Sequence, residues 1–234
     1  RAGVAVHWRD NQSGCKGVCD GLSNDTVQAL DAPGLCSGGQ CLDEALLHGL
    51  KRHLATAQGA HLLVLHQLGS HGPSYFRRYP APFAHFVPAC THDDLSRCTR
   101  QEVVNAYDNS LRYTDHVLAQ LITQLASHTE VDSLLLYVSD HGESLGENGL
   151  FLHGMPYPIA PDVQTQVPML MWLSPGASST LGLDTNCLRQ QARTALSHDH
   201  LFHTLLGLFD VSTRLYEARL DFGAACRRTP AALS

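Results

Sequence analysis

The residues that could do chemistry gather where one apolar run ends. Residues 133–139 (SLLLYVS) stop at Asp140-His141-Gly142, and His153 follows in the same glycine-rich loop. A carboxylate oxygen and an imidazole nitrogen are both good zinc ligands, and the end of a strand holds them more firmly than a free loop does. The string therefore predicts a zinc site. The plain alternative is a turn-capping Asp140 beside solvated histidines, since short D-H-G strings also occur by chance.

A second apolar run delivers another histidine. Residues 61–68 (HLLVLHQL) are typical of a buried strand and are followed by the loop GSHGP, which contains His71. Open, mostly parallel sheets bind their ligands at the carboxyl ends of the strands, so both loops are expected at one edge. With His71 and His153 added to the pair above, the donors are one oxygen and three nitrogens, a set suited to zinc.

Other polar residues near these loops are given supporting roles. Glu143 and Glu147 are expected to be loop solvators or outer groups rather than ligands. Asn105, Asp108 and Asn109, within a predicted helix, are expected to be caps or part of a solvated face. The sequence has no G-x-S-x-G elbow, P-loop, H-E-x-x-H or G-x-G-x-x-G motif that points to a competing chemistry.

A layered scaffold is needed to position these groups. Apolar runs predict strands at 4–8, 61–68, 133–139 and 167–173, and helical spacing predicts helices at 43–57, 99–127 and 198–209. Thr99 and Glu102 form a capping box, and Ser197 is expected to be an N-cap. The apolar stripe of the long helix is expected to be Val103, Tyr107, Leu111, Leu118, Leu121 and Leu125. This order of elements predicts an α/β fold, a mostly parallel sheet flanked by helices on both faces.

Composition limits the functional class. The chain has 234 residues, of which 44% are hydrophobic and 16% charged, as in a globular domain. The net charge of -6 provides no basic surface for nucleic acid. No run of 18 apolar residues predicts a membrane span. The chain opens at Arg1, almost inside a predicted strand and without Met, and this suggests a fragment of a longer protein.

The cysteines indicate an oxidising compartment. They are even in number and six of them lie in closely spaced pairs that flank polar loops, which favours short-loop disulfides. Cys187 and Cys226 then pair by elimination. A structural zinc site is the alternative for the first four, although their gaps are irregular and lack a C-x2-C knuckle. The eight are Cys15, Cys19, Cys36, Cys41, Cys90, Cys98, Cys187 and Cys226.

Four segments of the sequence are specific enough to indicate a family. They are "WRDNQSGCKGVCD", "HQLGSHGPSYFRRYP", "NAYDNSLRYTD" and "YVSDHGESLGENGLFLHGMPYPIAP". Together they closely resemble the lipid A phosphoethanolamine transferases, including the mobile colistin-resistance enzymes. The similarity covers essentially the whole chain, and long matches without gaps are highly specific.

The resemblance implies a sulfatase-like (alkaline-phosphatase-like) domain at the periplasmic face of the bacterial inner membrane, tethered by an N-terminal membrane domain. It implies zinc-dependent transfer of phosphoethanolamine from phosphatidylethanolamine to a phosphate of lipid A, with one zinc expected and more allowed. By motif, Asp140 and His141 match zinc ligands. His71 and His153 match histidines that line the donor phosphate or bind a further zinc.

Two further residues and one departure follow from the same resemblance. Lys16 and Gln12 fall where family members contact phosphoethanolamine, although family members often have Asn at the position of Gln12. The family's nucleophilic Thr and a Glu that completes its zinc site precede the segment that corresponds to Arg1. Residues 1–234 are therefore expected to be a partial catalytic domain, inactive or nearly so without the segment that carries them.

Three alternatives remain open at the level of sequence. One is a related enzyme of the same superfamily. It would be either a hydrolase, such as a sulfatase or phosphodiesterase, or a phosphoethanolamine transferase that acts on glucans or heptose. Another is a folded but inactive fragment. The third is a cysteine-rich binding module that uses residues 15–41 as a zinc knuckle.

Overall fold

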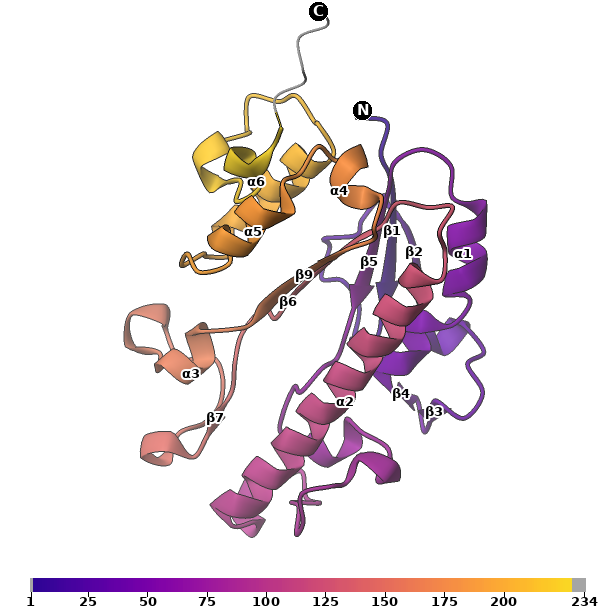
Figure 1. The fold of residues 1–234 in the computed structure, drawn as a ribbon. Helices are drawn as coiled ribbons and strands as arrows, with labels where there is room; N and C mark the ends of the chain where they lie inside the picture. Colours follow the sequence, from indigo (N-terminus) through magenta and orange to yellow (C-terminus); the bar gives the residue numbers. More distant parts are fainter. Residues whose placement is uncertain (1, 229–234) are drawn as a thin grey trace, which may run out of the picture.

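Parallel strands form one part of the fold in the computed structural model, which describes residues 2–228. Strands β2, β1 and β5 form a parallel sheet in that order, with Trp8 of β1 beside Val64 of β5. A second sheet pairs β6 with β9 in antiparallel register. Two short hairpins, β3–β4 and β7–β8, complete the strands (Figure 1). The strands are β1 Ala5–Asp10, β2 Ser23–Thr26, β3 Cys36–Ser37, β4 Gln40–Cys41, β5 His61–His66, β6 Leu134–Val138, β7 Ser144–Leu145, β8 Phe151–Leu152 and β9 Met169–Leu173.

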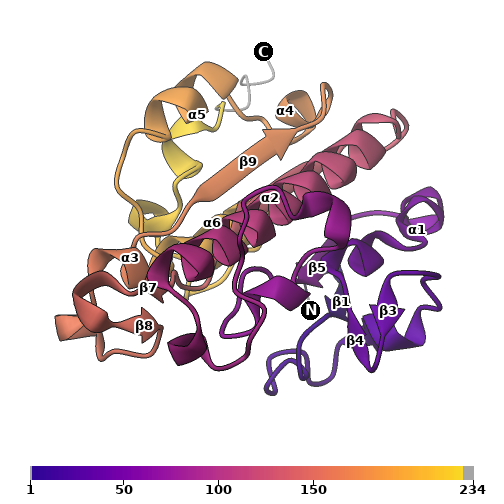
Figure 2. The ribbon, with the colours of Figure 1, turned by 90° about the horizontal axis from the view of Figure 1, so that it is seen from below.

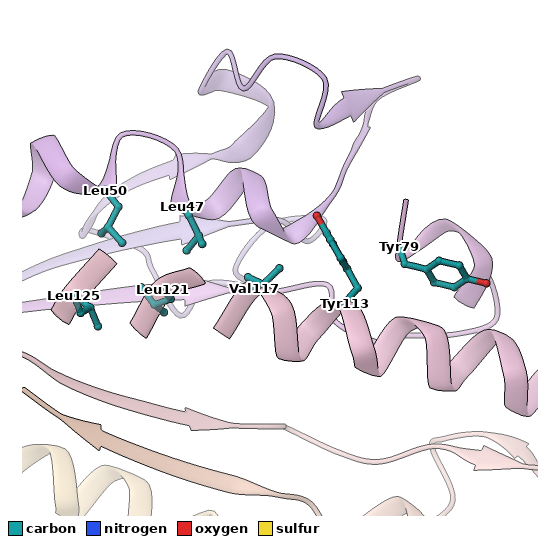
Figure 3. Packing of buried hydrophobic residues seen from close by; sticks show 7 residues of the cluster. All are labelled: Leu47, Leu50, Tyr79, Tyr113, Val117, Leu121 and Leu125. Carbon is teal, nitrogen blue, oxygen red and sulfur yellow. The ribbon is translucent and has the colours of Figure 1, made fainter. Parts of the chain in front are cut away.

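One long helix connects the two sheets. α2 begins after Thr99, whose side chain accepts a hydrogen bond from the Glu102 N–H while Glu102 bonds back to the Thr99 N–H, so the predicted capping box is confirmed. Its buried side chains, such as Val117 and Leu121, form a core cluster shown in Figure 3. Leu63 of β5 and Trp172 of β9 pack against this cluster, so α2 covers both sheets. The helices are α1 Leu50–Thr56, α2 Arg100–Ala126, α3 Asp162–Thr165, α4 Ala177–Thr180, α5 Thr185–Gln191 and α6 Asp199–Leu208.

Helices lie on both sides of the strands, as the sequence predicts. In Figure 1, β6 and β9 run between α2 and the C-terminal helices α5 and α6, and Figure 2 shows β9 between α2 and α5 from below. Within residues 2–228, the outer strands β2 and β5 of the first sheet and both strands of the second, β6 and β9, each have one edge that pairs with no strand. The fold is therefore α/β with a central parallel sheet, but its strands stand in two separate groups. None of the described helices is both long and apolar enough to cross a membrane.

Several predicted boundaries are wrong for local reasons. The helix expected at 43–57 is a 3-10 turn, Asp43–Leu47, followed by α1, because Gly49 has a φ of +68° and interrupts the helix. β2 has the polar sequence SNDT and gives no hydrophobic signal, so hydrophobic patterning does not predict it. The N-cap of α6 is His198 rather than Ser197, whose hydroxyl instead donates to Asp199.

The polar face of α2 also differs from expectation. Leu111, placed in the apolar stripe, is 43% exposed. Asn105 and Asn109, expected to be caps or part of a solvated face, are buried. Asn109 accepts hydrogen bonds from the backbone N–H groups of His85 and Phe86, and Asn105 donates to the Pro88 carbonyl. Both asparagines therefore fasten the long 70–98 loop to the helix, and neither is a free surface group.

All eight cysteines form disulfides. Cys15 pairs with Cys19, Cys36 with Cys41, Cys90 with Cys98, and Cys187 with Cys226. The pairing is the one expected from the spacing, and the alternative of a four-thiol zinc knuckle is wrong. The last bridge ties α5 to the turn Ala224–Cys226, and the Asp184 N–H donates to the Cys226 carbonyl beside it.

Candidate metal centre

Three histidines from two distant segments of the chain meet at one point. His71, His141 and His153 each offer a ligand atom, and these atoms all lie within 4.8 Å of one another. The rings of His141 and His153 stack with centroids 3.8 Å apart, and the ring of His71 stands edge-on to His153 at 4.9 Å. The two loops expected at one edge of the strands therefore do meet there.

Three strand ends position the cluster. His71 lies in the loop after β5, His141 closely follows the end of β6, and His153 directly follows β8. The β7–β8 hairpin turns the chain back, so that His153 lies over His141. Gly142 is required here, because a Cβ at this position would collide with the Val163 carbonyl oxygen. The short strands and this close backbone approach together hold the histidines in place.

Hydrogen bonds at Nδ1 set the tautomers of the three rings. The Nδ1–H of His71 donates to the Gly72 carbonyl at 2.7 Å, and that of His141 donates to the Gly142 carbonyl at 3.0 Å. The Nδ1–H of His153 donates to the Glu143 carboxylate at 3.1 Å. A carbonyl or carboxylate oxygen can only accept, so each Nδ1 carries the proton. In the neutral state, Nε2 of each ring is then free as a lone-pair donor to a metal.

Glu143 has the second of the two roles expected of it, that of an outer group that orients a histidine. It is only 7% exposed, so it is not a loop solvator. Besides His153, it accepts hydrogen bonds from the Gly72 N–H at 3.1 Å and the Tyr75 hydroxyl at 3.2 Å. Burial and the charge of Glu143 both raise the pKa of Tyr75, so its hydroxyl stays protonated and continues to donate. Glu147 has a different role, because it pairs with Arg100 at 2.9 Å.

Two more carboxylates hold the ends of β1 and β5. Asp43 accepts from the Asn11 amide and from the N–H groups of Leu68 and Gly69, just before the His71 loop. Burial raises the pKa of Asp43, and these donors offset part of that effect. Burial acts in the same direction on Asp10, yet hydrogen bonds from His66 and Trp8 hold the pKa of Asp10 below its usual range.

The remaining predicted site residues lie around the cluster or at a distance from it. Asp140 has an 80% exposed side chain, with an oxygen 3.7 Å from Nε2 of His141. Gln12, on the loop after β1, donates to the Gln67 carbonyl at 2.8 Å. Lys16 is exposed and donates to Ser13 at 3.2 Å. The structure therefore unites the histidines and places Asp140 beside them, while Gln12 and Lys16 make their hydrogen bonds elsewhere.

The donor chemistry fits zinc. Zinc prefers imidazole nitrogen and carboxylate oxygen in tetrahedral sites, with Zn–N distances of about 2.0–2.1 Å and hence ligand atoms roughly 3.3 Å apart. The three histidine donors lie within 4.8 Å of one another, so a small inward movement would bring them to that spacing. Asp140 is free to turn toward the same point, because its side chain is exposed.

The chain is similar to known proteins. A family model described as Sulfatase matches residues 1–211. Over 230 residues the chain is 49% identical to phosphoethanolamine transferase EptA of Escherichia coli, and this match spans 97% of the chain. It is 41% identical to phosphatidylethanolamine transferase Mcr-1, also of Escherichia coli, over 95% of the chain.

A solved structure has the same fold. The soluble domain of lipooligosaccharide phosphoethanolamine transferase A from Neisseria meningitidis superposes with a TM-score of 0.91 at 44% identity. The match covers 97% of this chain and 69% of that one. The chain spans only 42% of the length of the Escherichia coli EptA protein and 41% of Mcr-1.

Proposed function

Because this chain belongs to the sulfatase family, we propose that residues 1–234 form part of a zinc-dependent phosphoethanolamine transferase. The donor would be phosphatidylethanolamine and the acceptor a phosphate of lipid A. The observation that carries this proposal is the convergence of His71, His141 and His153, whose donor atoms lie within 4.8 Å of one another. A site of this kind suits a reaction in which phosphate charge must be neutralised.

The histidines and Asp140 have separate roles in the proposal. Asp140 and His141 are the zinc ligands, and their neighbour His153 is oriented for the same site by Glu143. Zinc held there would lower the pKa of a coordinated hydroxyl and neutralise phosphate charge. His71 and His153 both lie against the ring of His141. Their Nε2 atoms would either bind zinc, when the rings are neutral, or donate N–H bonds to phosphoryl oxygens, when the rings are protonated.

Gln12 and Lys16 complete the proposed donor site. Gln12 is joined to the Gln67 carbonyl, on the chain that leads to His71, and is proposed to contact the phosphoethanolamine group. Lys16 lies on an exposed loop closed by the Cys15–Cys19 bridge. Its ammonium would add a mobile positive charge at a phosphate.

The nucleophile is proposed to lie outside residues 1–234. The chain covers 69% of the matched soluble domain, and β5 and β6 each leave an edge that no described strand pairs. A further strand that joins these two edges would unite the sheets and bring its carboxyl end to the histidines. We propose that this part of the catalytic domain carries the Thr nucleophile and a Glu ligand. The whole enzyme would act at the periplasmic face of the inner membrane, tethered by a membrane domain.

Zinc titration of the chain tests the centre directly. We expect about one zinc per chain, measured by competition with a chromophoric chelator. His141→Ala should lower zinc affinity by at least about 100-fold, more than the loss of an outer group would. His48→Ala removes an exposed histidine outside the cluster and should change nothing, which makes it the matched control.

The activity itself is tested in the full-length protein. Mass spectrometry of lipid A from cells that express it should show added phosphoethanolamine, and His141→Ala should abolish the addition. Full modification by His141→Ala with zinc still bound would contradict the assignment. Release of free phosphoethanolamine to water, with no modified lipid A, would favour a hydrolase of the same family.

A further inference from the structure

Exposed apolar side chains are concentrated beside the histidine cluster. Five large apolar residues between positions 151 and 163 are exposed to solvent, with Tyr157 at 82% and Ile159 at 65%. Proteins rarely expose such a concentration without a partner, so it marks an interaction surface. The five are Phe151, Met155, Tyr157, Ile159 and Val163. We call residues 155–160, with Tyr157 and Ile159 at their centre, the apolar loop.

The apolar loop carries no charge. Residues 148–161 contain no Asp, Glu, Lys or Arg, and His153 is the one histidine among them. Pro156 and Pro158 restrict the backbone around Tyr157, so the exposed ring is held out at a low cost in conformational entropy. A surface of this composition can enter an apolar medium without taking a charge with it.

The base of the apolar loop is fastened to the histidine cluster. The buried side chain of Gln164 accepts from the Met155 N–H at 3.4 Å and donates to the Ser144 hydroxyl at 2.8 Å. The Gln164 carbonyl also accepts from the Gly142 N–H at 3.0 Å, next to His141. These bonds join Met155, at the start of the loop, through Gln164 to Gly142 and Ser144, in the segment that carries His141. The base of the loop is therefore attached to the chain that positions the histidines.

We propose that the apolar loop inserts into the interface of a zwitterionic phospholipid bilayer. This inference rests on the proposed function, in which the donor phosphate is a lipid headgroup that must reach the histidines at the membrane surface. Tyrosine favours the boundary between headgroups and acyl chains, where its ring is buried and its hydroxyl stays wet. Interfacial segments enter this boundary by about 5–10 Å, a depth that the tip of a short loop can reach.

The absence of Lys and Arg from the apolar loop predicts which lipids it should bind. Attraction to anionic lipids comes from Lys and Arg near the membrane surface and weakens with salt. The apolar loop has neither residue, so its binding should depend on apolar burial alone. It should bind phosphatidylcholine vesicles, should gain little from anionic lipid, and should persist at high salt.

Vesicle partitioning of residues 1–234 tests this. The chain should co-sediment with phosphatidylcholine vesicles equally at low and high salt. The double variant Tyr157→Ser/Ile159→Ser should lower the partition coefficient by at least about tenfold, from the lost apolar burial. Leu215→Ser, which changes a residue 67% exposed outside the loop, is the matched control and should leave it unchanged.

Three outcomes would overturn the proposal. They are no binding by the unaltered chain, equal binding by the double variant, or binding that disappears in salt. A dimer in solution that the double variant converts to monomer, without vesicle binding, would assign the loop to a second copy of the chain instead. Ile159→Trp adds a direct readout, since brominated phosphatidylcholine should quench its fluorescence and should not quench that of Leu215→Trp.

Zinc affinity separates this inference from the proposed function. The double variant changes exposed residues only and should bind zinc as tightly as the unaltered chain. Intact zinc binding without any vesicle binding would reject the membrane role and leave the transferase proposal standing. Vesicle binding without zinc binding would reject the zinc-dependent transferase proposal and leave the membrane role of the apolar loop standing.

Discussion

Two buried carboxylates, Asp43 and Glu143, bind the backbone before and after His71, and each accepts three hydrogen bonds. The partners of Asp43 are the Asn11 amide and two backbone N–H groups at the end of β5. Those of Glu143 are a backbone N–H, the Tyr75 hydroxyl and the ring of His153. A buried carboxylate with three hydrogen-bond donors therefore has a different role in each place. Asp43 fixes the backbone of the fold, and Glu143 fixes a side chain of the candidate site.

This difference decides what each carboxylate can affect. The hydrogen bonds of Asp43 reach no histidine, so its loss should be felt as a loss of stability throughout that strand end. Glu143 orients the His153 ring and sets its tautomer, so its loss should be felt at Nε2, where a metal would bind. Stability and zinc affinity are thus two separate measurements that should distinguish the two residues.

The largest effect is expected for Asp43→Ala. The change leaves the Asn11 amide and the N–H groups of Leu68 and Gly69 without their acceptor inside the protein. Each unsatisfied buried group costs about 1–3 kcal/mol, so the free energy of unfolding should fall by about 3–5 kcal/mol. Urea unfolding followed by circular dichroism measures this. Asp43→Asn keeps one acceptor oxygen and should lose less of the free energy of unfolding. Equal stability of the unaltered chain, Asp43→Ala and Asp43→Asn would show that Asp43 does not stabilise the fold.

A smaller effect, now on the metal, is expected for Glu143→Gln. Glutamine keeps the shape of the side chain but offers one oxygen in place of two, so the Nδ1–H of His153 must share or lose its acceptor. Outer groups of this kind are worth about 10–100-fold in metal affinity. Zinc competition should show that loss in Glu143→Gln, whereas Glu147→Gln, whose carboxylate pairs with Arg100, should bind zinc normally. Equal zinc affinity in Glu143→Gln and Glu147→Gln would show that Glu143 does not support the metal site.

The elements that the sequence predicts correctly are those with a local signal. The capping box of α2 lies within four consecutive residues, and the runs that form β5, β6 and β9 are predominantly apolar. The order of strands and loops also sufficed to bring His71 to His141, because the carboxyl ends of such strands share an edge. The D-H-G string and the two other histidines are therefore accessible from the sequence alone.

The features that sequence reasoning misses depend on partners far along the chain. Glu143 is buried because Gly72 and Tyr75 lie against it from about 70 positions away, and no local pattern reports that contact. The burial of Asn109 likewise depends on the loop at His85 and Phe86. A polar residue inside an amphipathic pattern is ordinarily solvated, so only the tertiary fold reveals that these two are anchors.

The smallest effect, and the finest test of the comparison, is expected for Tyr75→Phe. It removes one donor from Glu143, on Oε2, while His153 bonds to Oε1, so zinc affinity should hold and stability should fall by about 1 kcal/mol.

The effect of Tyr75→Phe on stability should also depend on pH. Burial and the charge of Glu143 raise the pKa of Tyr75 above its ordinary value of 10.0, so the unfolded chain loses this proton first as the pH rises. The stability from Tyr75 is fully present below pH 10 and declines above it, because the unfolded state then binds fewer protons than the folded state. Tyr75→Phe should remove this part of the alkaline decline, measured as the difference between the two proteins in urea unfolding at about pH 9 and about pH 11. A parallel decline in both would show that Tyr75 ionises freely and that Glu143, unlike Asp43, is held by fewer donors than the geometry indicates.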